Sequence, residues 1–490
     1  MPSLPIPQPG QRTRVAGLHG SADALALARL AAARKPLAIF TSTAADGQRL
    51  VQEIRWFAPA LRTLLLPDWE TLPYDSFSPH QDLVSERLAT LYQVSHEGCD
   101  IFVVPVTTAL YRLPPVEFLA GYSFFLKQGE IIVPETLRTQ LTLAGYQHVT
   151  QVVSPGEYSY RGGLIDLFPM GSVVPYRIDL LDNEVESIRT FDVDTQRSIY
   201  KVKDVRLLPA REFPTDEDAR TRFRQGFRER FEGDPSKSQI YKDVSNGVFP
   251  AGIEYYLPLF FERTATISDY LPQQALVCLH GDIASAVEDF WRDTRSRHQL
   301  LRGDRDRPLL PPQDLFLTSD QLFGAVKPFA RLELHAGAPD QAEFDAGFVP
   351  LPSVQVDRRS DDPLHRLRDF LGKRGERTLL CAESLGRRET LLHYLGDHGL
   401  NVAVCDGFAA FEAAQQPVML AVAPIANGFV DALGLACVTE NELYASQARS
   451  RDRREAADRA TAENILRDLS ELKVGDPVVH VHHGIGRYLG

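Results

Sequence analysis

The sequence of 490 residues has few cysteines, too little positive charge to coat nucleic acid, and no long apolar run. Its five cysteines are scattered without a CxxC pair, which argues against a zinc ribbon and against a disulfide framework. Acidic residues outnumber basic ones by 65 to 53, so a protein that coats nucleic acid by itself is disfavoured. No apolar run approaches the roughly 18–20 residues that span a bilayer. We therefore expect a cytoplasmic protein that does not enter the membrane.

The length and composition are those of a folded chain with several domains. Hydrophobic residues make up 44% and charged residues 24%, as in ordinary globular proteins. In residues 1–121, short apolar runs at 37–40, 64–66 and 101–104 alternate with amphipathic segments. Continuous apolar strands separated by helices indicate a parallel sheet that is covered on both faces. The first segment is therefore expected to be an α/β domain.

The pattern changes several times along the chain. Residues 122–214 read as short strands in succession, with turn signals at Gly162-Gly163 and Asp182-Asn183, and predict an inserted, mostly antiparallel α+β domain. Residues 215–345 return to α/β structure, and residues 350–446 predict a small α/β domain. A charged linker helix is expected at 447–472, and the opening strand and turn of a further domain at 473–490.

A degenerate phosphate loop lies near the start of the chain. It reads Gly17, Leu18, His19, Gly20, Ser21, Ala22, Asp23, Ala24. A working loop of the form GxxxxGK[ST] needs a second glycine, a lysine for the phosphates and a hydroxyl for magnesium. Ala22, Asp23 and Ala24 stand at these three positions. We expect a helix N-terminus in which Asp23 complements the helix dipole, and neither a nucleotide site nor a catalytic residue.

Four longer stretches carry a family resemblance: residues 66–93, 156–199, 250–261 and 475–490. They closely resemble the bacterial transcription-repair coupling factors, the Mfd family, and the resemblance covers essentially the whole chain in order. The first three stretches also resemble the nucleotide-excision repair protein UvrB. The resemblance thus identifies the chain as the N-terminal portion of a coupling factor, with a UvrB-like module.

The family resemblance implies an architecture and a function. Residues 1–121 and 215–345 would form a degenerate RecA/helicase-like module, split by a UvrA-binding domain at 122–214. The strand at 473–490 would begin a β-rich, Tudor-like domain that binds the β subunit of RNA polymerase. The family displaces polymerase stalled at DNA damage with an ATP-driven double-stranded DNA translocase and recruits UvrA for nucleotide-excision repair.

The resemblance also implies that ATP hydrolysis is not carried out by residues 1–490. The motor, with its ATP and magnesium, is expected beyond residue 490, and this chain alone is expected to be inactive as an ATPase. Asp282 alone stands where UvrB would carry an acidic magnesium motif, and the chain enters a helix directly after Pro79, where UvrB has a long hairpin. The alternative interpretation is a UvrB-like, ATP-dependent, damage-verifying helicase subunit.

Three residues of the inserted domain match the UvrA contacts of the family. They are Arg161, Arg177 and Leu181, and other members carry an aromatic residue at the third position. Strand alternation places Arg177 and Leu181 on one face. Arg161 precedes two glycines, where a turn presents a side chain. Arginine suits a protein interface because its planar group pairs with carboxylates at two points.

Three further groups of residues each allow a functional and a structural interpretation. The histidines His480, His482 and His483 resemble a metal site, but a plain strand is favoured because no cysteine or third aligned ligand is nearby. Arg449, Arg451, Arg453 and Arg454 are either a DNA-phosphate contact or, with the acids between them, a self-paired helix. Trp69 and Tyr74 are interpreted as packing residues, with stacking on nucleic acid as the alternative. No metal site is therefore expected.

Overall fold

The structure is a computed structural model that describes residues 4–335, 342–374, 377–432 and 434–444, and the strands 477–480 and 484–487. The expected linker 447–472 lies outside the described residues, with its arginines from 449 to 454, and so do His482 and His483. The chain divides into two compact units, Met1–Phe348 and Val349–Gly490. Among the described residues, no helix has the length and apolar character needed to cross a membrane.

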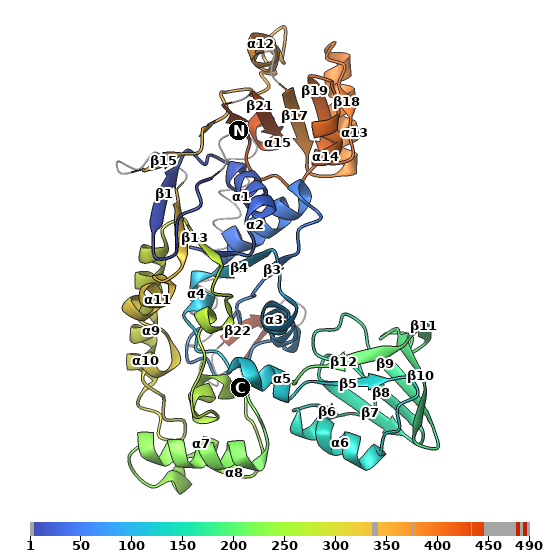
Figure 1. The fold of residues 1–490 in the computed structure, drawn as a ribbon, viewed down its shortest axis with the longest axis vertical. Coiled ribbons are helices and arrows are strands. Elements are labelled where there is room, and N and C mark those ends of the chain that lie inside the picture. Colours follow the sequence, from blue (N-terminus) through green and yellow to red (C-terminus); the bar gives the residue numbers. More distant parts are fainter. Residues whose placement is uncertain are drawn as a thin grey trace. The chain divides into compact units, whose positions relative to one another are not determined.

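The first unit is built on a seven-stranded sheet in which every neighbouring pair is parallel (Figure 1). The strand order is β15 (Phe344–Asp345), β1 (Arg12–Ala16), β14 (Ala330–Leu334), β13 (Leu276–His280), β2 (Leu37–Thr41), β4 (Ile101–Pro105) and β3 (Thr63–Leu65). The apolar runs predicted as strands are β2, β3 and β4, and the parallel sheet is confirmed. Ala38 and Phe40 of β2 join the main core, which also contains Val287 and Trp291 of helix α9 (Ile283–Leu301).

Several helices of this unit begin at a residue whose side chain caps the helix. The α-helices are α1 (Ala22–Ala33), α2 (Ala44–Phe57), α3 (Gln81–Tyr92), α4 (Val106–Ala109), α5 (Val116–Gly121), α7 (Glu217–Arg230), α8 (Gln239–Ser245), α9 (Ile283–Leu301), α10 (Pro312–Leu315) and α11 (Ser319–Val326). Shorter helical segments are η1 (Gln93–Glu97), η2 (Pro235–Lys237), η3 (Ile253–Leu259) and η4 (Ile267–Tyr270). Thr43 caps α2 by accepting the Asp46 N–H at 3.0 Å, as its spacing predicts.

The inserted strands and one helix gather together in cyan and green in Figure 1. The six-stranded sheet runs in the order β11 (Ser198–Val202), β10 (Glu184–Phe191), β9 (Tyr176–Leu181), β8 (Leu164–Leu167), β7 (Glu157–Arg161) and β6 (Gln147–His148). All its pairs are antiparallel except β6 with β7. A separate pair joins β5 (Phe124–Lys127) to β12 (Asp204–Leu207). Ile178 on one sheet face is buried in the same core as Leu137 of α6 (Pro134–Leu143).

The return from the insert is fixed to α3 by a buried ion pair. Arg87 Nε donates to Glu212 Oε1 at 2.6 Å and Nη2 donates to Oε2 at 3.3 Å, with the two side chains only 1% and 2% exposed. Trp69 Nε1 also donates to Glu212 Oε1, at 3.0 Å. Trp69 and Tyr74 are both buried, which confirms their interpretation as packing residues.

The second unit holds its own small α/β sheet. Its order is β16 (Phe348–Val349), β20 (Phe429–Asp431), β21 (Leu435–Thr439), β17 (Arg377–Ala382), β19 (Val418–Val422) and β18 (Ala403–Val404). Its helices are α12 (His365–Arg374), α13 (Leu385–Asp397), α14 (Phe408–Ala413) and α15 (Glu440–Leu443). Farther along, β22 (Pro477–His480) and β23 (Gly484–Arg487) pair antiparallel, so the expected opening strand is present. The expected turn, at residues 481–483, lies outside the described residues.

Candidate docking face and a filled phosphate loop

Strand pairing brings the three predicted contact residues to one face of the inserted sheet. Arg161 on β7 pairs with Leu164 on β8, and Leu164 pairs with Asp179 on β9. Laterally paired residues in a sheet share a face, and so do residues two apart in one strand. Arg177 and Leu181 each lie two positions from Asp179, so they share the face of Arg161.

Arg177 is held in place by its neighbours on this face. Its Nε donates to Asp166 Oδ1 at 2.7 Å, its Nη2 to Oδ2 at 2.9 Å, and its Nη1 to the Gln196 carbonyl at 3.0 Å. The guanidinium also lies 4.8 Å from the centre of the Phe191 ring. The hydrogen bond to Asp166 raises the pKa of Arg177 above its usual range. Sequence reasoning missed this pair, because the two residues meet only through strand pairing.

Arg161 is exposed at the tip of a tight hairpin. Its Nη2 donates to the carbonyl of Thr150, and its side chain otherwise faces solvent. Gly162 has a φ of 59°, a conformation that glycine adopts without strain. A Cβ on Gly163 would lie 2.8 Å from the Leu180 carbonyl oxygen, closer than side chains approach. The two glycines therefore let this hairpin come close to β9 and present Arg161.

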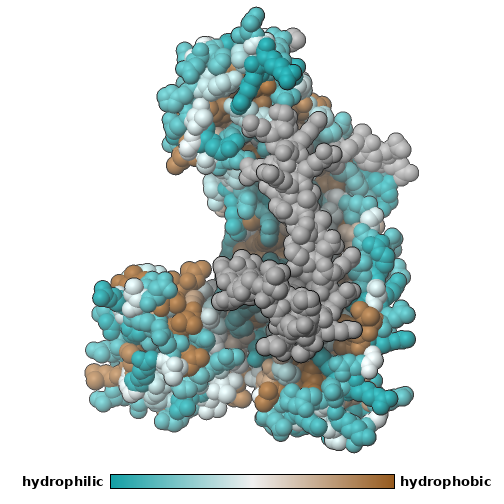
Figure 2. Space-filling view, turned by 180° about the vertical axis from the view of Figure 1, so that it is seen from behind, coloured by the Kyte–Doolittle hydropathy of each residue, from teal (hydrophilic) through white to brown (hydrophobic). Residues whose placement is uncertain are grey.

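The hairpin end of β9 is apolar and open. Leu181 is 61% exposed and immediately precedes Asp182 and Asn183, whose φ angles of 49° and 69° are those of a two-residue mirror-image turn. Figure 2 shows apolar side chains among hydrophilic ones on the surface of the inserted domain. An exposed arginine and an exposed apolar side chain on one sheet face are a combination typical of protein interfaces.

A second ion pair, between Arg189 and Asp179, lies on the same face. Arg189 Nη2 and Ser187 Oγ both donate to Asp179 Oδ2, the serine at 2.6 Å. Burial alone would raise the pKa of Asp179, but these hydrogen bonds outweigh it and lower the pKa. The middle of the face is thus a set of fixed, paired charges. Its chemistry suits recognition of another protein.

In the phosphate loop, a carboxylate occupies the position of the missing lysine. Arg49 donates from Nη1 to Asp23 Oδ1 at 3.0 Å and from Nη2 to Oδ2 at 2.6 Å, and His280 Nε2 lies 2.7 Å from Oδ2. Burial would raise the pKa of Asp23, but the bonds to His280 and Arg49 lower it to about 2. Asp23 lies in the first turn of α1, as expected, and its ion pair with Arg49 is an addition that the sequence did not reveal.

The rest of the loop is filled by the chain itself. Ser21 Oγ donates to Glu53 Oε1 at 2.7 Å, and Arg49 donates to Glu53 Oε2 at 2.7 Å. The Ala24 N–H, which would face a phosphate, donates to Asp23 Oδ1 at 2.6 Å. A Cβ at Gly17 would lie 2.1 Å from Asp345 Oδ1. Gly20 has a positive φ of 57°, and Ala22 is the first residue of α1. Two carboxylates would meet a polyphosphate here, so these residues do not fit a nucleotide.

Two other sequence candidates have structural roles. Asp282 is the N-cap of α9 and accepts from the Ser285 N–H at 3.0 Å and the Ser285 hydroxyl at 2.7 Å. Residues 66–80 are all described, and none of them lies in a helix or strand, so the chain reaches α3 without a hairpin. In the described parts of the chain, no group of three or more His, Cys, Asp or Glu residues is arranged to hold a metal ion.

The first unit is an α/β scaffold with a filled phosphate loop, and its inserted sheet presents Arg161 and Leu181 to solvent. The family described as the UvrB interaction domain matches residues 124–213, and the family described as the MFD D3 domain matches residues 370–443. The chain is similar over its whole length to the N-terminal portion of the transcription-repair-coupling factors, and the resemblance seen in the sequence is confirmed.

Three relatives show the extent of this similarity. The transcription-repair-coupling factor of Escherichia coli (strain K12) is 40% identical over 493 residues, which cover 100% of this chain and 42% of the relative. The factor of Haemophilus influenzae is 37% identical, with 100% and 43% covered, and that of Bacillus subtilis is 26% identical, with 97% and 42% covered. The chain thus spans less than half the length of these curated relatives.

Proposed function

We propose that this chain is the UvrA-recruiting, N-terminal part of a factor that couples transcription to nucleotide-excision repair. The observation that carries the proposal is the open face of the inserted domain, within the match to the UvrB interaction domain at residues 124–213. On that face, Arg161 is exposed and Arg177 is held by Asp166. Both arginines stand where the family resemblance puts UvrA contacts.

The proposed recognition uses the two arginines differently. Arg161 donates from Nη2 to the Thr150 carbonyl but is exposed, so its other N–H groups can form a two-point pair with a carboxylate of UvrA. Arg177 is already oriented by Asp166 and Gln196, so it loses little side-chain entropy when a partner covers it. Leu181 supplies apolar contact at the edge of the same face. We propose these three residues as the UvrA-binding site.

The same proposal assigns a role to each of the other domains. Residues 1–121 and 215–345 serve as the decayed RecA-like scaffold, 122–214 as the UvrA-binding domain, 350–446 as the small domain and 447–472 as the linker. The domain that begins at 473 binds the β subunit of RNA polymerase in the cytoplasm. Translocation on double-stranded DNA belongs to an ATP- and magnesium-dependent motor beyond residue 490.

The rival function is a UvrB-like ATP-dependent helicase. It requires a lysine and a metal-binding hydroxyl, and the chain has Asp23 and Ala24 there, with Asp23 paired to Arg49. It also requires a hairpin that enters DNA, and residues 66–80 contain no strand. ATP turnover by the purified chain, with and without DNA, separates the two proposals. Appreciable hydrolysis would favour the helicase.

The direct test measures UvrA affinity with matched arginine variants. Arg161→Ala should weaken binding of purified UvrA by about 10-fold or more, as truncation of an interface hot spot does. Arg138→Ala is the control, because Arg138 is an exposed arginine on α6, whose apolar side packs on the opposite face of the sheet. Binding that is equal for the two variants would contradict the proposed site.

A further inference from the structure

A short segment before α6 extends the docking face beyond the three predicted residues. Ile131 forms an antiparallel bridge with Glu184 of β10, and the Ile132 N–H donates to the Asn183 carbonyl at 2.8 Å. The Val185 N–H donates to the Glu130 carbonyl at 2.9 Å. The segment 129–132 therefore lies along the edge of β10 next to its hairpin turn.

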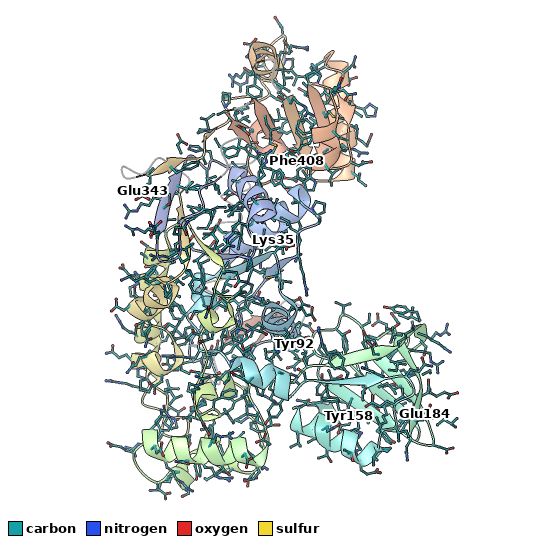
Figure 3. The ribbon with its side chains drawn as sticks, viewed as in Figure 1. Lys35, Tyr92, Tyr158, Glu184, Glu343 and Phe408 are labelled. Atoms are coloured by element: carbon teal, nitrogen blue, oxygen red, sulfur yellow. The ribbon has the colours of Figure 1, made fainter. Side chains whose placement is uncertain are left out.

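The side chain of Ile131 points to the same side as the docking face. Glu184 pairs with Leu181 across the hairpin and with Ile131 on its other side, so the three side chains share a face. Ile132, the next residue, is buried in the core on the opposite face, as alternation requires. Figure 3 labels Glu184, the residue between the two apolar neighbours, on the inserted domain.

The two apolar side chains are unusually open to solvent. Ile131 is 76% exposed and Leu181 is 61% exposed, although both are aliphatic and both stand in paired backbone. A single exposed aliphatic residue needs no explanation, whereas two that flank one acidic residue, on the sheet face that also carries an exposed arginine, are a combination typical of an interface. Across the face, Ile131 is followed by Glu184 on β10 and Leu181 on β9, and Arg161 lies two strands further on, on β7.

We propose that Ile131 and Leu181 form a two-part apolar anchor that straddles Glu184 and completes the docking face. The inference rests on the proposed function, and the occupant is UvrA. The partner surface must then offer apolar pockets on either side of a basic side chain, which would pair with Glu184. Continuity with the face of Arg161, and the family match at 124–213 that includes all these residues, support one common partner. Ile131 is thus a specificity-determining residue that the sequence did not indicate.

The test compares exposed apolar residues of one domain in the full 490-residue chain. Ile131→Ser and Leu181→Ser should each weaken UvrA binding about 5- to 10-fold, mainly by faster dissociation, and the double variant should bind more weakly than either. Val173→Ser should bind as the unmodified chain does. Val173 is 92% exposed in the loop between β8 and β9, at the end of β9 opposite Leu181. Equal melting temperatures would exclude a folding defect.

Three results would overturn the anchor. If Ile131→Ser binds UvrA normally while Arg161→Ala does not, the anchor is wrong and the proposed docking site stands. If neither variant weakens binding, both the anchor and the proposed docking site are wrong. Self-association of the chain that Ile131→Ser abolishes, with UvrA binding intact, would assign the apolar pair to a second copy and also overturn the proposal. Glu184→Lys should weaken UvrA binding like the serine variants.

Discussion

Asp166 and Arg177 form a two-point ion pair across the neighbouring strands β8 and β9, with N–O distances of 2.7 and 2.9 Å. The Arg177 side chain is 19% exposed and that of Asp166 only 7%. The arginine expected to contact UvrA therefore also compensates a buried carboxylate. Arg177 therefore has a structural role and a proposed binding role, so a substitution that removes it is expected to change both the stability of the fold and the affinity for UvrA.

The first prediction concerns the structural role of Arg177, which is measured by the stability of the fold. Arg177→Ala should lower the free energy of unfolding by roughly 1–3 kcal/mol, because Asp166 is left buried without its partner. Arg161→Ala should change it little, because Arg161 is exposed. Thermal unfolding of the two variants measures the difference. The double variant Asp166→Asn/Arg177→Ala should recover part of the loss, and identical melting curves for Arg161→Ala and Arg177→Ala would show that the pair does not stabilise the fold.

The second prediction concerns the hairpin that presents Arg161. Gly163→Ala should distort the hairpin and weaken UvrA binding several-fold, because its Cβ would lie 2.8 Å from the Leu180 carbonyl oxygen. Gly162→Asn is the matched control. Open space surrounds Gly162, and asparagine tolerates its positive φ of 59°. Affinity measurements on the two variants should therefore differ, and normal binding by Gly163→Ala would mean that the hairpin shape does not matter.

Local sequence patterns were sufficient to predict individual strands, helix starts and turns. The strand at residues 37–40 is visible as a continuous apolar run, and Thr43 marks the start of the next helix by its spacing to Asp46. The turn at Asp182-Asn183 is likewise visible, because few residue pairs adopt its backbone angles. The resemblance to the coupling factors then supplied Arg161 and Arg177, which composition alone would leave as ordinary surface arginines.

Contacts between distant residues could not be predicted in this way. Asp23 and Arg49 are 26 positions apart and meet because α1 and α2 pack together. Ile131 reaches the docking face only through its bridge to Glu184, and the short apolar run 131–133 before a helix gives no signal of that pairing. Strand pairing and helix packing depend on the whole chain, so the partners of Asp23 and Ile131 appear only in three dimensions.

The third prediction tests the attachment of the insert to α3. Arg87→Met should destabilise the chain by about 3–5 kcal/mol, because Glu212 would remain as a buried charge without its partner. Arg87→Met combined with Glu212→Gln should recover much of this loss, since glutamine is neutral and its oxygen still accepts from Trp69 Nε1. Thermal unfolding and limited proteolysis near residue 212 are the measurements. A double variant as unstable as Arg87→Met would show that the unpaired charge is not the cause.

The last prediction uses the lowered pKa of Asp23. The folded pKa of about 2 lies below the ordinary value of 3.8, so the ionised carboxylate stabilises the fold fully above about pH 4 and loses this effect as the pH falls through 2. The shift corresponds to roughly 2 kcal/mol at neutral pH and about half of that at pH 3. Asp23→Asn should therefore lower the melting temperature more at pH 6 than at pH 3. Asp194→Asn, in an exposed turn, is the control. A deficit of Asp23→Asn that is as large at pH 3 as at pH 6 would mean that the ion pair with Arg49 does not stabilise the loop.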